Sequence, residues 1–336
     1  MMIFDEKTIR VFRIFQNQRR GGFTYEKLLV DQLNSNSLKV IGVPVSNILP
    51  FSKGIRFQQL IRMVEYNRQE SLLDIRSIIP TVSLLLARRK ETKHIAVFHH
   101  HDSIGQSQPI FTEVFFRLFL ISAKKYISKV VVVAEFWKEY LEKRGLTNIC
   151  VIKNGFDVKD ISSVSEEECV QFRRKYNLEN KRIIYIGNNS RIKGVYIAYS
   201  QLKTAFPEHQ LIASGEKFGK EPFLVLNMPY REYLVLLKVS ECAVIYSLFN
   251  EGWCRTAHEA MLLKTPVVGS GKGGMRELLE NGKQIICTNP KTLEKSVDMA
   301  INDKESLGEA GYKYAAQFDL NHFKESWMEL ITGLLD

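Results

Sequence analysis

The chain has 336 residues, of which 45% are apolar and 25% are charged. This length corresponds to about two domains, and the composition is that of a globular protein, which excludes a disordered or fibrous chain. The five cysteines form no C-x-x-C pair, so neither a zinc site nor a disulfide framework is indicated.

The net charge is +10, and the whole excess lies in the first half of the chain. Residues 1–150 contain 23 Lys and Arg against 13 Asp and Glu, whereas residues 151–336 contain 24 of each kind. A basic lobe favours an anionic partner such as a membrane surface, a phosphate-bearing lipid or nucleic acid. The alternative is that the charge only keeps the lobe soluble. A nucleic-acid binder would also need basic and aromatic residues interleaved on one face, and no recognised motif of that kind is present.

Neither a signal peptide nor a membrane-spanning segment is expected. The N-terminus lacks a basic region followed by a long apolar stretch. The most apolar helical segment, residues 111–121, is interrupted by Glu113 and Arg117, so it falls short of the roughly 18 uncharged apolar residues that a spanning helix needs.

The first half of the chain alternates strand and helix patterns. Residues 10–15 alternate like a strand, and Gly21 and Gly22 follow just before a helical pattern. A glycine pair there lets the backbone approach a ligand and offers helix N–H groups to an anion, although an ordinary tight turn has the same pattern. Residues 38–43 predict a second strand. Residues 51–68 predict either a basic amphipathic helix for a membrane surface or a helix that faces the core.

Three consecutive histidines, residues 99–101, follow a strand predicted at residues 94–98. A single metal site is disfavoured, because adjacent residues at a strand end point to opposite sides. A buried helix is predicted at residues 111–126, a buried strand at 130–133, a helix at 135–145 and a turn at Asn154-Gly155.

The second half begins with a polar segment, residues 158–181, which we interpret as a linker with a short helix. A strand at 182–187 and a polar loop ending in Lys193-Gly194 then precede a helix. Helix N–H groups and a lysine charge suit a diphosphate; the alternative is that Lys193 is a solvated residue. Further strands are predicted at 210–214, 223–226 and 284–287, and further helices at 232–239, 291–302, 304–317 and 321–335.

Two glutamates dominate the stretch 249–274. Glu251 follows a strand pattern at residues 243–246, and Glu259 comes eight positions later in a helical pattern. A second short strand and a glycine loop with Gly273 and Gly274 come next. Eight helical residues make about two turns, so both carboxylates could face one cleft. Strand, acidic loop, helix, strand and glycine loop is the order of a doubly wound α/β sheet, in which ligands bind at the carboxyl ends of the strands.

This stretch resembles the E-x7-E motif of retaining glycosyltransferases with the GT-B fold, of the family 4 (group 1) type. The continuation at residues 259–278 and the Asn-Gly segment at residues 150–157 resemble the same family. Two positions depart from its pattern: Ala134 stands where serine is usual, and Asn188 stands where an arginine is usual. The resemblance implies two Rossmann-like α/β domains facing a central cleft, with a last helix that crosses back to the first domain. The implied domains are residues 1–157 with 320–336, and residues 182–319, joined by 158–181.

The resemblance also implies roles for particular residues. Glu259 would accept hydrogen bonds from the donor ribose, and Glu251 would lie beside the donor sugar. His101, with His99 as the alternative, would contact that sugar. The remaining donor-binding residues would be Gly21, Gly22, Arg191, Lys193, Gly273 and Gly274, with Arg191 replacing the charge lost at Asn188. No D-x-D motif occurs, so neither a metal nor another cofactor is expected.

The expected reaction is transfer of a hexosyl group from a UDP- or GDP-sugar to an acceptor hydroxyl. A cytoplasmic location is the default expectation for unpaired thiols. A basic first half without a spanning segment fits a cytoplasmic enzyme that docks on the inner face of a membrane, with a lipid-linked or oligosaccharide acceptor, in lipopolysaccharide or other surface polysaccharide biosynthesis. One alternative is a catalytically inactive GT-B protein that binds glycan or nucleotide, which the departures at Ala134 and Asn188 allow. Another is an epimerase or phosphorylase of the same fold, although no cofactor-lysine signature of a phosphorylase is present.

Overall fold

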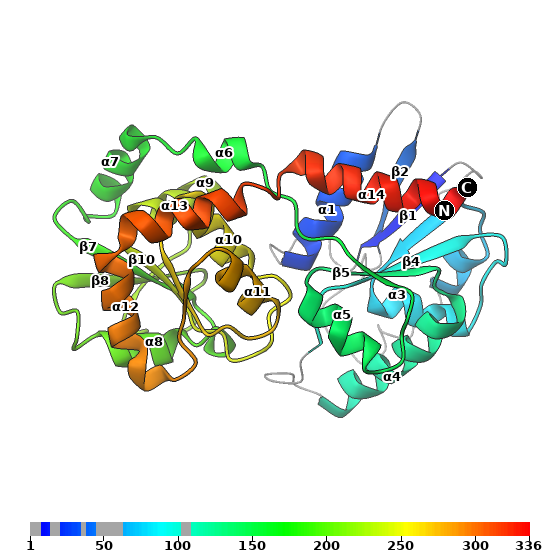
Figure 1. The fold of residues 1–336 in the computed structure, drawn as a ribbon, viewed down its shortest axis with the longest axis horizontal. Coiled ribbons are helices and arrows are strands. Elements are labelled where there is room, and N and C mark those ends of the chain that lie inside the picture. Colours follow the sequence, from blue (N-terminus) through cyan, green and yellow to red (C-terminus); the bar gives the residue numbers. More distant parts are fainter. Residues whose placement is uncertain (1–7, 14–20, 35–37, 45–62, 102–108) are drawn as a thin grey trace. The chain divides into compact units, whose positions relative to one another are not determined.

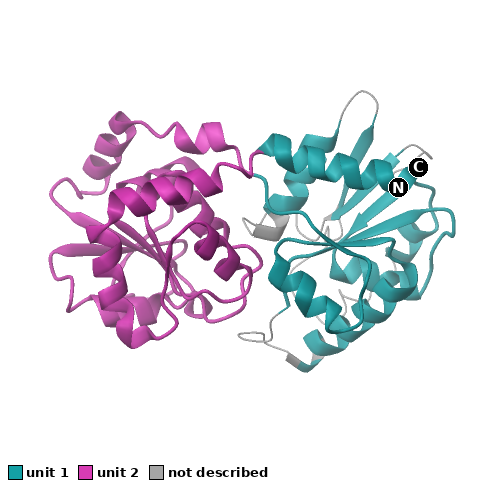
Figure 2. Cartoon of the chain, in the orientation of Figure 1, with its two compact units in different colours: residues 1–155, 320–336 teal, residues 156–319 magenta. Residues whose placement is uncertain are grey.

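A computed structural model describes residues 8–13, 21–34, 38–44, 63–101 and 109–336. The chain divides into two compact units (Figure 2). Unit 1 comprises residues 1–155 and 320–336, and unit 2 comprises residues 156–319. The helix predicted at residues 51–68 lies mostly outside the described residues, as do Phe15 and Asp102.

Unit 1 contains a six-stranded parallel sheet of order β2-β1-β3-β4-β5-β6 (Figure 1). The strands are β1 (Thr8–Arg13), β2 (Lys39–Pro44), β3 (Leu73–Arg76), β4 (Lys93–Phe98), β5 (Lys129–Val132) and β6 (Ile149–Val151). Its helices include α1 (Gly21–Leu33), α3 (Ile78–Val82), α4 (Pro109–Tyr126), α5 (Glu135–Glu142) and α14 (Leu320–Leu335). Right-handed crossovers place α1 on one face of the sheet and α3, α4 and α5 on the other.

The last helix, α14, is part of unit 1 although it follows all of unit 2 in sequence. Its buried residues Phe323, Trp327 and Ile331 recur every four positions, as the predicted apolar stripe requires. Trp327 is fully buried, and its indole Nε1 donates a hydrogen bond of 3.1 Å to the hydroxyl of Tyr25 on α1. That hydroxyl donates in turn to the carbonyl of Ile152 at 3.2 Å. The predicted return of the last helix to the first domain is therefore confirmed.

Strand β3 holds a buried ionic cluster. The Asp74 carboxylate receives hydrogen bonds from Arg10 on the neighbouring strand, with Oδ1 at 2.6 Å and Oδ2 at 2.9 Å, and from Arg76 at 2.5 Å. All three side chains are almost completely buried. The two guanidinium groups hold the pKa of Asp74 well below its usual range despite the opposing effect of burial.

Unit 2 contains a second six-stranded parallel sheet, of order β12-β11-β10-β7-β8-β9. The strands are β7 (Arg182–Asn188), β8 (His209–Ser214), β9 (Leu224–Leu226), β10 (Cys242–Ile245), β11 (Val267–Gly269) and β12 (Ile285–Ile286). In order of appearance this is 6-5-4-1-2-3, which is the Rossmann arrangement. The chain therefore has the two-domain, doubly wound architecture that the sequence predicts.

The helices of unit 2 cover both faces of this sheet (Figure 1). They are α6 (Val158–Ser162), α7 (Glu166–Lys175), α8 (Val195–Leu202), α9 (Tyr230–Val239), α10 (Arg255–Leu262), α11 (Gly274–Asn281), α12 (Leu293–Asn302) and α13 (Lys304–Ala315). Apolar residues of α8 and α12 form one core with alternate strand residues such as Ile184, Val244 and Val268. Residues 158–181, interpreted from sequence as a linker with a short helix, form the two helices α6 and α7 within unit 2.

Candidate functional site

The candidate site of unit 2 is set by its strand order. The order reverses between β7 and β10, which are neighbours in the middle of the sheet. The loops after these two strands leave their carboxyl ends in opposite directions, and ligands of open α/β sheets bind at such a switch point. The loop after β7 carries Lys193, and the loop after β10 carries Ser247 and Glu251.

Lys193 and Glu251 form an ion pair across the switch point. The Lys193 ammonium lies 2.7 Å from Oε1 of Glu251, and the Glu251 carboxylate is almost completely buried. The hydroxyl of Ser247 donates a second hydrogen bond to the same oxygen. The Lys193 ammonium also lies 4.6 Å from the centre of the Phe249 ring. A buried carboxylate is stable only when it is paired and hydrogen-bonded, and these groups supply both.

Gly194 is required directly after Lys193. Its φ of 70° lies in the left-handed region, and a Cβ at this position would collide with the carbonyl oxygen of Tyr246. Only glycine meets both conditions without strain. The tight turn between the short 3-10 helix Arg191–Lys193 and α8 therefore brings Lys193 against the loop after β10.

The glycine loop packs against the backbone of Glu251. The Glu251 amide donates to the carbonyl of Lys272 at 3.3 Å, and the Gly274 amide donates to the Glu251 carbonyl at 2.9 Å. Gly273 has a φ of 63°, and a Cβ there would collide with the Glu251 backbone. The two glycines thus hold Glu251 in place. The sequence predicts that their N–H groups face phosphate or sugar. In the structure the Gly274 amide instead donates to the Glu251 carbonyl.

Glu259 lies on α10 and is only 4% exposed. Its Oε1 accepts a hydrogen bond of 3.0 Å from the Tyr230 hydroxyl, and its Oε2 accepts one of 3.2 Å from the Tyr233 hydroxyl. Arg255, one turn earlier, lies 3.6 Å from Oε1. Burial raises the pKa of Glu259, while Arg255 and the two hydroxyls oppose that rise. The two tyrosines were not among the site residues predicted from sequence.

Glu251 and Glu259 both raise the pKa of the buried cysteine that lies between them in the sequence. Cys254 precedes α10 with a φ of 69°, an uncommon conformation for a residue other than glycine. Its pKa is raised first by burial and next by the charge of Glu251, and Glu259 adds to the rise while Lys193 opposes it. The charges of two carboxylates and one lysine therefore act on a single thiol.

Two other residues of this segment are structural. The indole of Trp253 donates to Nδ1 of His258 at 3.1 Å, so the proton of this ring is on Nε2, which lies 3.1 Å from the carbonyl of Ala315. The His258 ring stacks on Phe156 with a centroid distance of 3.8 Å. Burial lowers the pKa of His258 to about 3, so the ring is neutral.

Arg191 lies beside Tyr196 of α8. Its side chain is exposed, and its guanidinium carbon lies 6.0 Å from the centre of the Tyr196 ring. With Tyr196 and Ile197 it lines a hollow of about 300 Å³ at the start of α8. Asn188 is exposed at the end of β7. The expected replacement of the missing arginine by Arg191 thus stays a prediction.

The remaining candidates belong to unit 1. His101 stacks on Phe116 at a centroid distance of 4.0 Å, and its Nε2 lies 3.3 Å from Glu113 of α4. The His99 ring packs edge-on against Tyr25 at 5.1 Å, and burial lowers its pKa to about 3. Gly21 and Gly22 form the first turn of α1. These residues come from the carboxyl-end side of β1 and β4, where the sequence pattern placed them.

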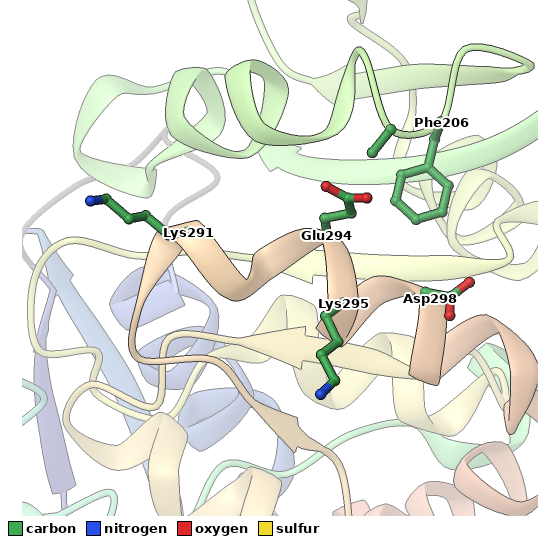
Figure 3. Close-up of a pocket in the computed structure, with 6 residues that line it drawn as sticks. Phe206, Lys291, Glu294, Lys295 and Asp298 are labelled. Carbon is green, nitrogen blue, oxygen red and sulfur yellow. The ribbon is translucent and has the colours of Figure 1, made fainter.

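A separate hollow of about 360 Å³ lies between α12 and two residues that follow α8, Ala205 and Phe206 (Figure 3). Glu294 points toward the loop that carries Phe206, whereas Lys295 extends away from it. The lining side chains carry two positive and two negative charges, from Lys291, Glu294, Lys295 and Asp298. It includes none of the candidate residues.

Among residues 8–13, 21–34, 38–44, 63–101 and 109–336, no cluster of three or more His, Cys, Asp or Glu is arranged to hold a metal ion. No helix in those same ranges is long and apolar enough to cross a membrane.

The chain is similar in sequence to glycosyltransferases and in fold to GT-B structures. The family model described as glycosyl transferases group 1 matches residues 170–317, which include Lys193, Glu251 and Glu259. The two-sheet architecture is that of GT-B structures. HepE from Anabaena, solved in complex with UDP and glucose, superposes with a TM-score of 0.76 at 17% identity, over 97% of this chain and 100% of that one.

Two curated relatives are also similar in sequence. A putative glycosyltransferase, YtcC of Bacillus subtilis, is 25% identical over 54% of this chain, and the match spans about half, 53%, of that relative's own length. The O-antigen chain mannosyltransferase RfbU of Salmonella typhimurium is 26% identical over 73% of this chain and 69% of its own.

Proposed function

We propose that this chain transfers a hexosyl group from a nucleoside diphosphate sugar to an acceptor hydroxyl, with retention of anomeric configuration and without a metal. The observation that carries the proposal is the Lys193–Glu251 ion pair at the switch point of unit 2, in the same motif as the buried Glu259. A diphosphate requires a positive charge, which Lys193 offers. The hydroxyls of the sugar and of the ribose require acceptors, which the carboxylates of Glu251 and Glu259 offer.

Each group has a role that its surroundings support. Lys193 neutralises charge on the departing diphosphate, which is the main electrostatic task when no metal performs it. Glu251, held by Ser247 and by its own backbone, binds the sugar hydroxyls or stabilises the positive charge that develops on the sugar ring. Glu259 accepts from the two ribose hydroxyls, because a carboxylate offers two acceptor oxygens to a vicinal diol.

Unit 1 supplies further groups in this proposal. His101 contacts the donor sugar, with His99 as the alternative, and the first turn of α1 at Gly21 and Gly22 approaches the donor phosphates. His99 packs on Tyr25, which is tied to Trp327 and Ile152. Comparing His101→Ala with His99→Ala separates the two assignments: the sugar-contacting histidine loses transfer but keeps nucleotide binding.

The proposed donor is a UDP- or GDP-sugar. Support comes from the HepE structure, which is a complex with UDP and glucose, and from the mannosyltransferase relative. The first test is thermal unfolding with UDP, GDP, ADP and CMP, repeated on Glu259→Ala. A ligand at 100 times its dissociation constant adds about 2.7 kcal/mol of stability. A shift with one nucleotide that Glu259→Ala loses supports the donor site; no shift with any of the four contradicts it.

The transfer itself is tested with the donor that passes this screen. Release of the nucleotide in the presence of EDTA, and a product with the anomeric configuration of the donor by proton NMR, are the expected results. Glu251→Gln should abolish transfer while nucleotide binding persists. If the wild-type protein binds nucleotide but cleaves no nucleotide sugar, this result would favour the catalytically inactive alternative.

The acceptor is proposed to be lipid-linked or an oligosaccharide in lipopolysaccharide or another surface polysaccharide, on the cytoplasmic face of a membrane. The name of the O-antigen relative supports this class. A second support is the outward side of α4. Ile110 is 82% exposed, Val114 and Ile121 are about half exposed, and Lys124 and Lys125 lie at the end of the helix. Apolar side chains beside lysines suit an anionic bilayer.

This docking surface is tested by sedimentation with vesicles. Wild-type protein should bind vesicles of phosphatidylcholine mixed with anionic phosphatidylserine at low salt, and bind neutral phosphatidylcholine vesicles less. Ile121→Glu combined with Lys125→Glu should weaken binding about tenfold or more, because each basic residue near the surface contributes about 1 kcal/mol. Lys203→Glu, an exposed lysine of unit 2, is the matched control. Equal binding by all three proteins would contradict the assignment.

A further inference from the structure

Two tyrosine hydroxyls hold the carboxylate of Glu259. Tyr230 and Tyr233 lie three positions apart at the start of α9, so their side chains are on one face of that helix. Each donates to a different oxygen of the Glu259 carboxylate, at 3.0 Å and 3.2 Å. One hydroxyl on each oxygen fixes the plane of the carboxylate as well as its position.

The two tyrosines are themselves held by the sheet. Their rings stack with centroids 6.0 Å apart, and Tyr233 packs edge-on against Tyr185 of β7 at 6.2 Å. The Tyr185 hydroxyl lies 2.8 Å from the hydroxyl of Ser214 at the end of β8. Tyr185 and Tyr233 are buried deeply enough to raise the pKa of each well above its usual value. The support for Glu259 thus runs from α9 to two central strands.

The remaining acceptor capacity of Glu259 fits a diol. An ionised carboxylate offers about four lone-pair positions, and the two tyrosine hydroxyls occupy one on each oxygen. Tyr230, whose hydroxyl donates to Glu259, is 42% exposed, whereas Glu259 itself is only 4% exposed. The charged group beside Glu259 is Arg255 of α10. The titratable side chains that interact with it are Tyr230 and Tyr233 of α9, and Tyr185 of β7 and Cys254 interact with its charge.

We infer that Tyr230 and Tyr233 are positioning residues for ribose recognition: they clamp the Glu259 carboxylate so that its free acceptor positions meet the 2′- and 3′-hydroxyls of the bound nucleotide. This inference rests on the proposed function, in which Glu259 takes the ribose. The clamp makes the site specific for a ribonucleotide over a deoxyribonucleotide, because an analogue without the 2′-hydroxyl leaves an acceptor of a buried carboxylate unpaired.

The experiment compares UDP with 2′-deoxy-UDP by titration calorimetry. Wild-type protein should bind UDP at least about tenfold more tightly, since a hydrogen bond to a charged group is worth about that factor. In Tyr230→Phe and Tyr233→Phe the UDP affinity should fall while the 2′-deoxy-UDP affinity changes little, so that the ratio shrinks to about threefold or less. Loss of fold would weaken both ligands equally, which separates it from loss of positioning.

Tyr176→Phe is the matched control. The Tyr176 hydroxyl donates to Glu232 at 2.7 Å, so this variant removes another tyrosine–glutamate hydrogen bond of unit 2. It should keep the wild-type ratio of the two affinities. If both Tyr230→Phe and Tyr233→Phe also keep the wild-type ratio, the clamp is overturned.

A second readout needs no nucleotide. Removing a hydroxyl that donates to the charged form should raise the pKa of Glu259 further, as followed by carbon NMR of the free protein labelled at the glutamate carboxyl group, with Glu259→Gln identifying the signal. If wild-type protein binds no UDP, the proposed UDP donor fails, and this titration decides the clamp alone. An unchanged Glu259 pKa in both phenylalanine variants would then overturn it.

Discussion

The ammonium of Lys193 lies 2.7 Å from the buried carboxylate of Glu251. The two residues belong to the loops that follow the neighbouring strands β7 and β10, and these loops run in opposite directions. In the proposed function this pair holds the Lys193 ammonium in position to bind the diphosphate. Lys193→Ala should therefore weaken UDP binding about tenfold or more, while uridine, which has no phosphate, binds as it does to the wild type. Titration calorimetry with both ligands is the measurement. Lys203→Ala should leave both affinities unchanged, and an equal loss for UDP and uridine in Lys193→Ala would contradict the role.

Glu259 should make the protein less stable at neutral pH than a neutral side chain would. Burial raises its pKa above the ordinary value of 4.5. The folded state therefore holds this proton more tightly than the unfolded state, and stability falls as pH rises from about 4.5 through the raised pKa. Glu259→Gln should have a higher Tm than the wild type at pH 8, and the difference should disappear near pH 4. A difference that is constant with pH would contradict this assignment.

His258 should produce the opposite pH dependence. Its pKa falls from 6.5 to about 3 on folding, so the unfolded state takes up a proton that the folded state refuses. Stability is lost as pH decreases from about 6.5 toward 3, by up to about 1.4 kcal/mol per pH unit. His258→Gln should be less stable at pH 7 by about 1–3 kcal/mol and show a shallower loss between pH 6.5 and 4.

This pH dependence can be followed in unit 2 by urea unfolding. Of the three tryptophans, Trp253 belongs to unit 2, and Trp137 and Trp327 belong to unit 1. Fluorine NMR of fluorotryptophan-labelled protein therefore reports the two units separately. His322→Gln, at an exposed position of α14, is the control and should leave the Trp253 transition unchanged. Identical pH slopes in wild type and His258→Gln would exclude the buried neutral ring as the cause.

Trp327→Ala should destabilise unit 1 rather than unit 2. The side chain is fully buried and donates to Tyr25, so its removal leaves a cavity and takes away the hydrogen bond that the Tyr25 hydroxyl accepts, at a cost of about 3–5 kcal/mol. The Trp137 signal should report unfolding at lower urea, with the Trp253 signal little changed. Glu329→Ala, on the exposed side of α14, should change neither signal.

The parts of the structure that follow a simple period could be predicted from sequence. The strand before Lys193, the strand before Glu251 and the apolar stripe of α14 all appear where the pattern predicts them. Their side chains are apolar on the buried side, so local sequence and tertiary structure agree.

Strand β3 could not be predicted in this way. Its four residues, Leu-Asp-Ile-Arg, have the charge pattern of a surface segment, yet all four are buried. Asp74 and Arg76 tolerate burial only because Arg10 arrives from β1, 64 positions earlier. A pairing of that separation is invisible to a local pattern.

The candidate site shows the same limit. Glu251 and Glu259 stand out because their spacing is part of one motif, whereas Tyr230, Tyr233 and Ser247 join them only through folding. Two tyrosines three apart after a strand are a usable signal, since they must share a helix face, but nothing local indicates which acceptor they meet. Gly274 shows a similar limit: the glycine stands out in the sequence, but only the fold shows that its amide donates to the Glu251 carbonyl.

The place of α14 has a consequence for how the chain is made. Residues 320–336 belong to unit 1 but are translated after all of unit 2. During synthesis the emerging first unit waits, with Tyr25 and the surface around it uncovered, while the second unit leaves the ribosome and can fold. Trp327 can close the first unit only after residues 320–336 have left the ribosome. A ribosome that stops before residue 320 therefore produces a chain with one finished half and one open apolar surface, which is the kind of surface that chaperones and proteases recognise.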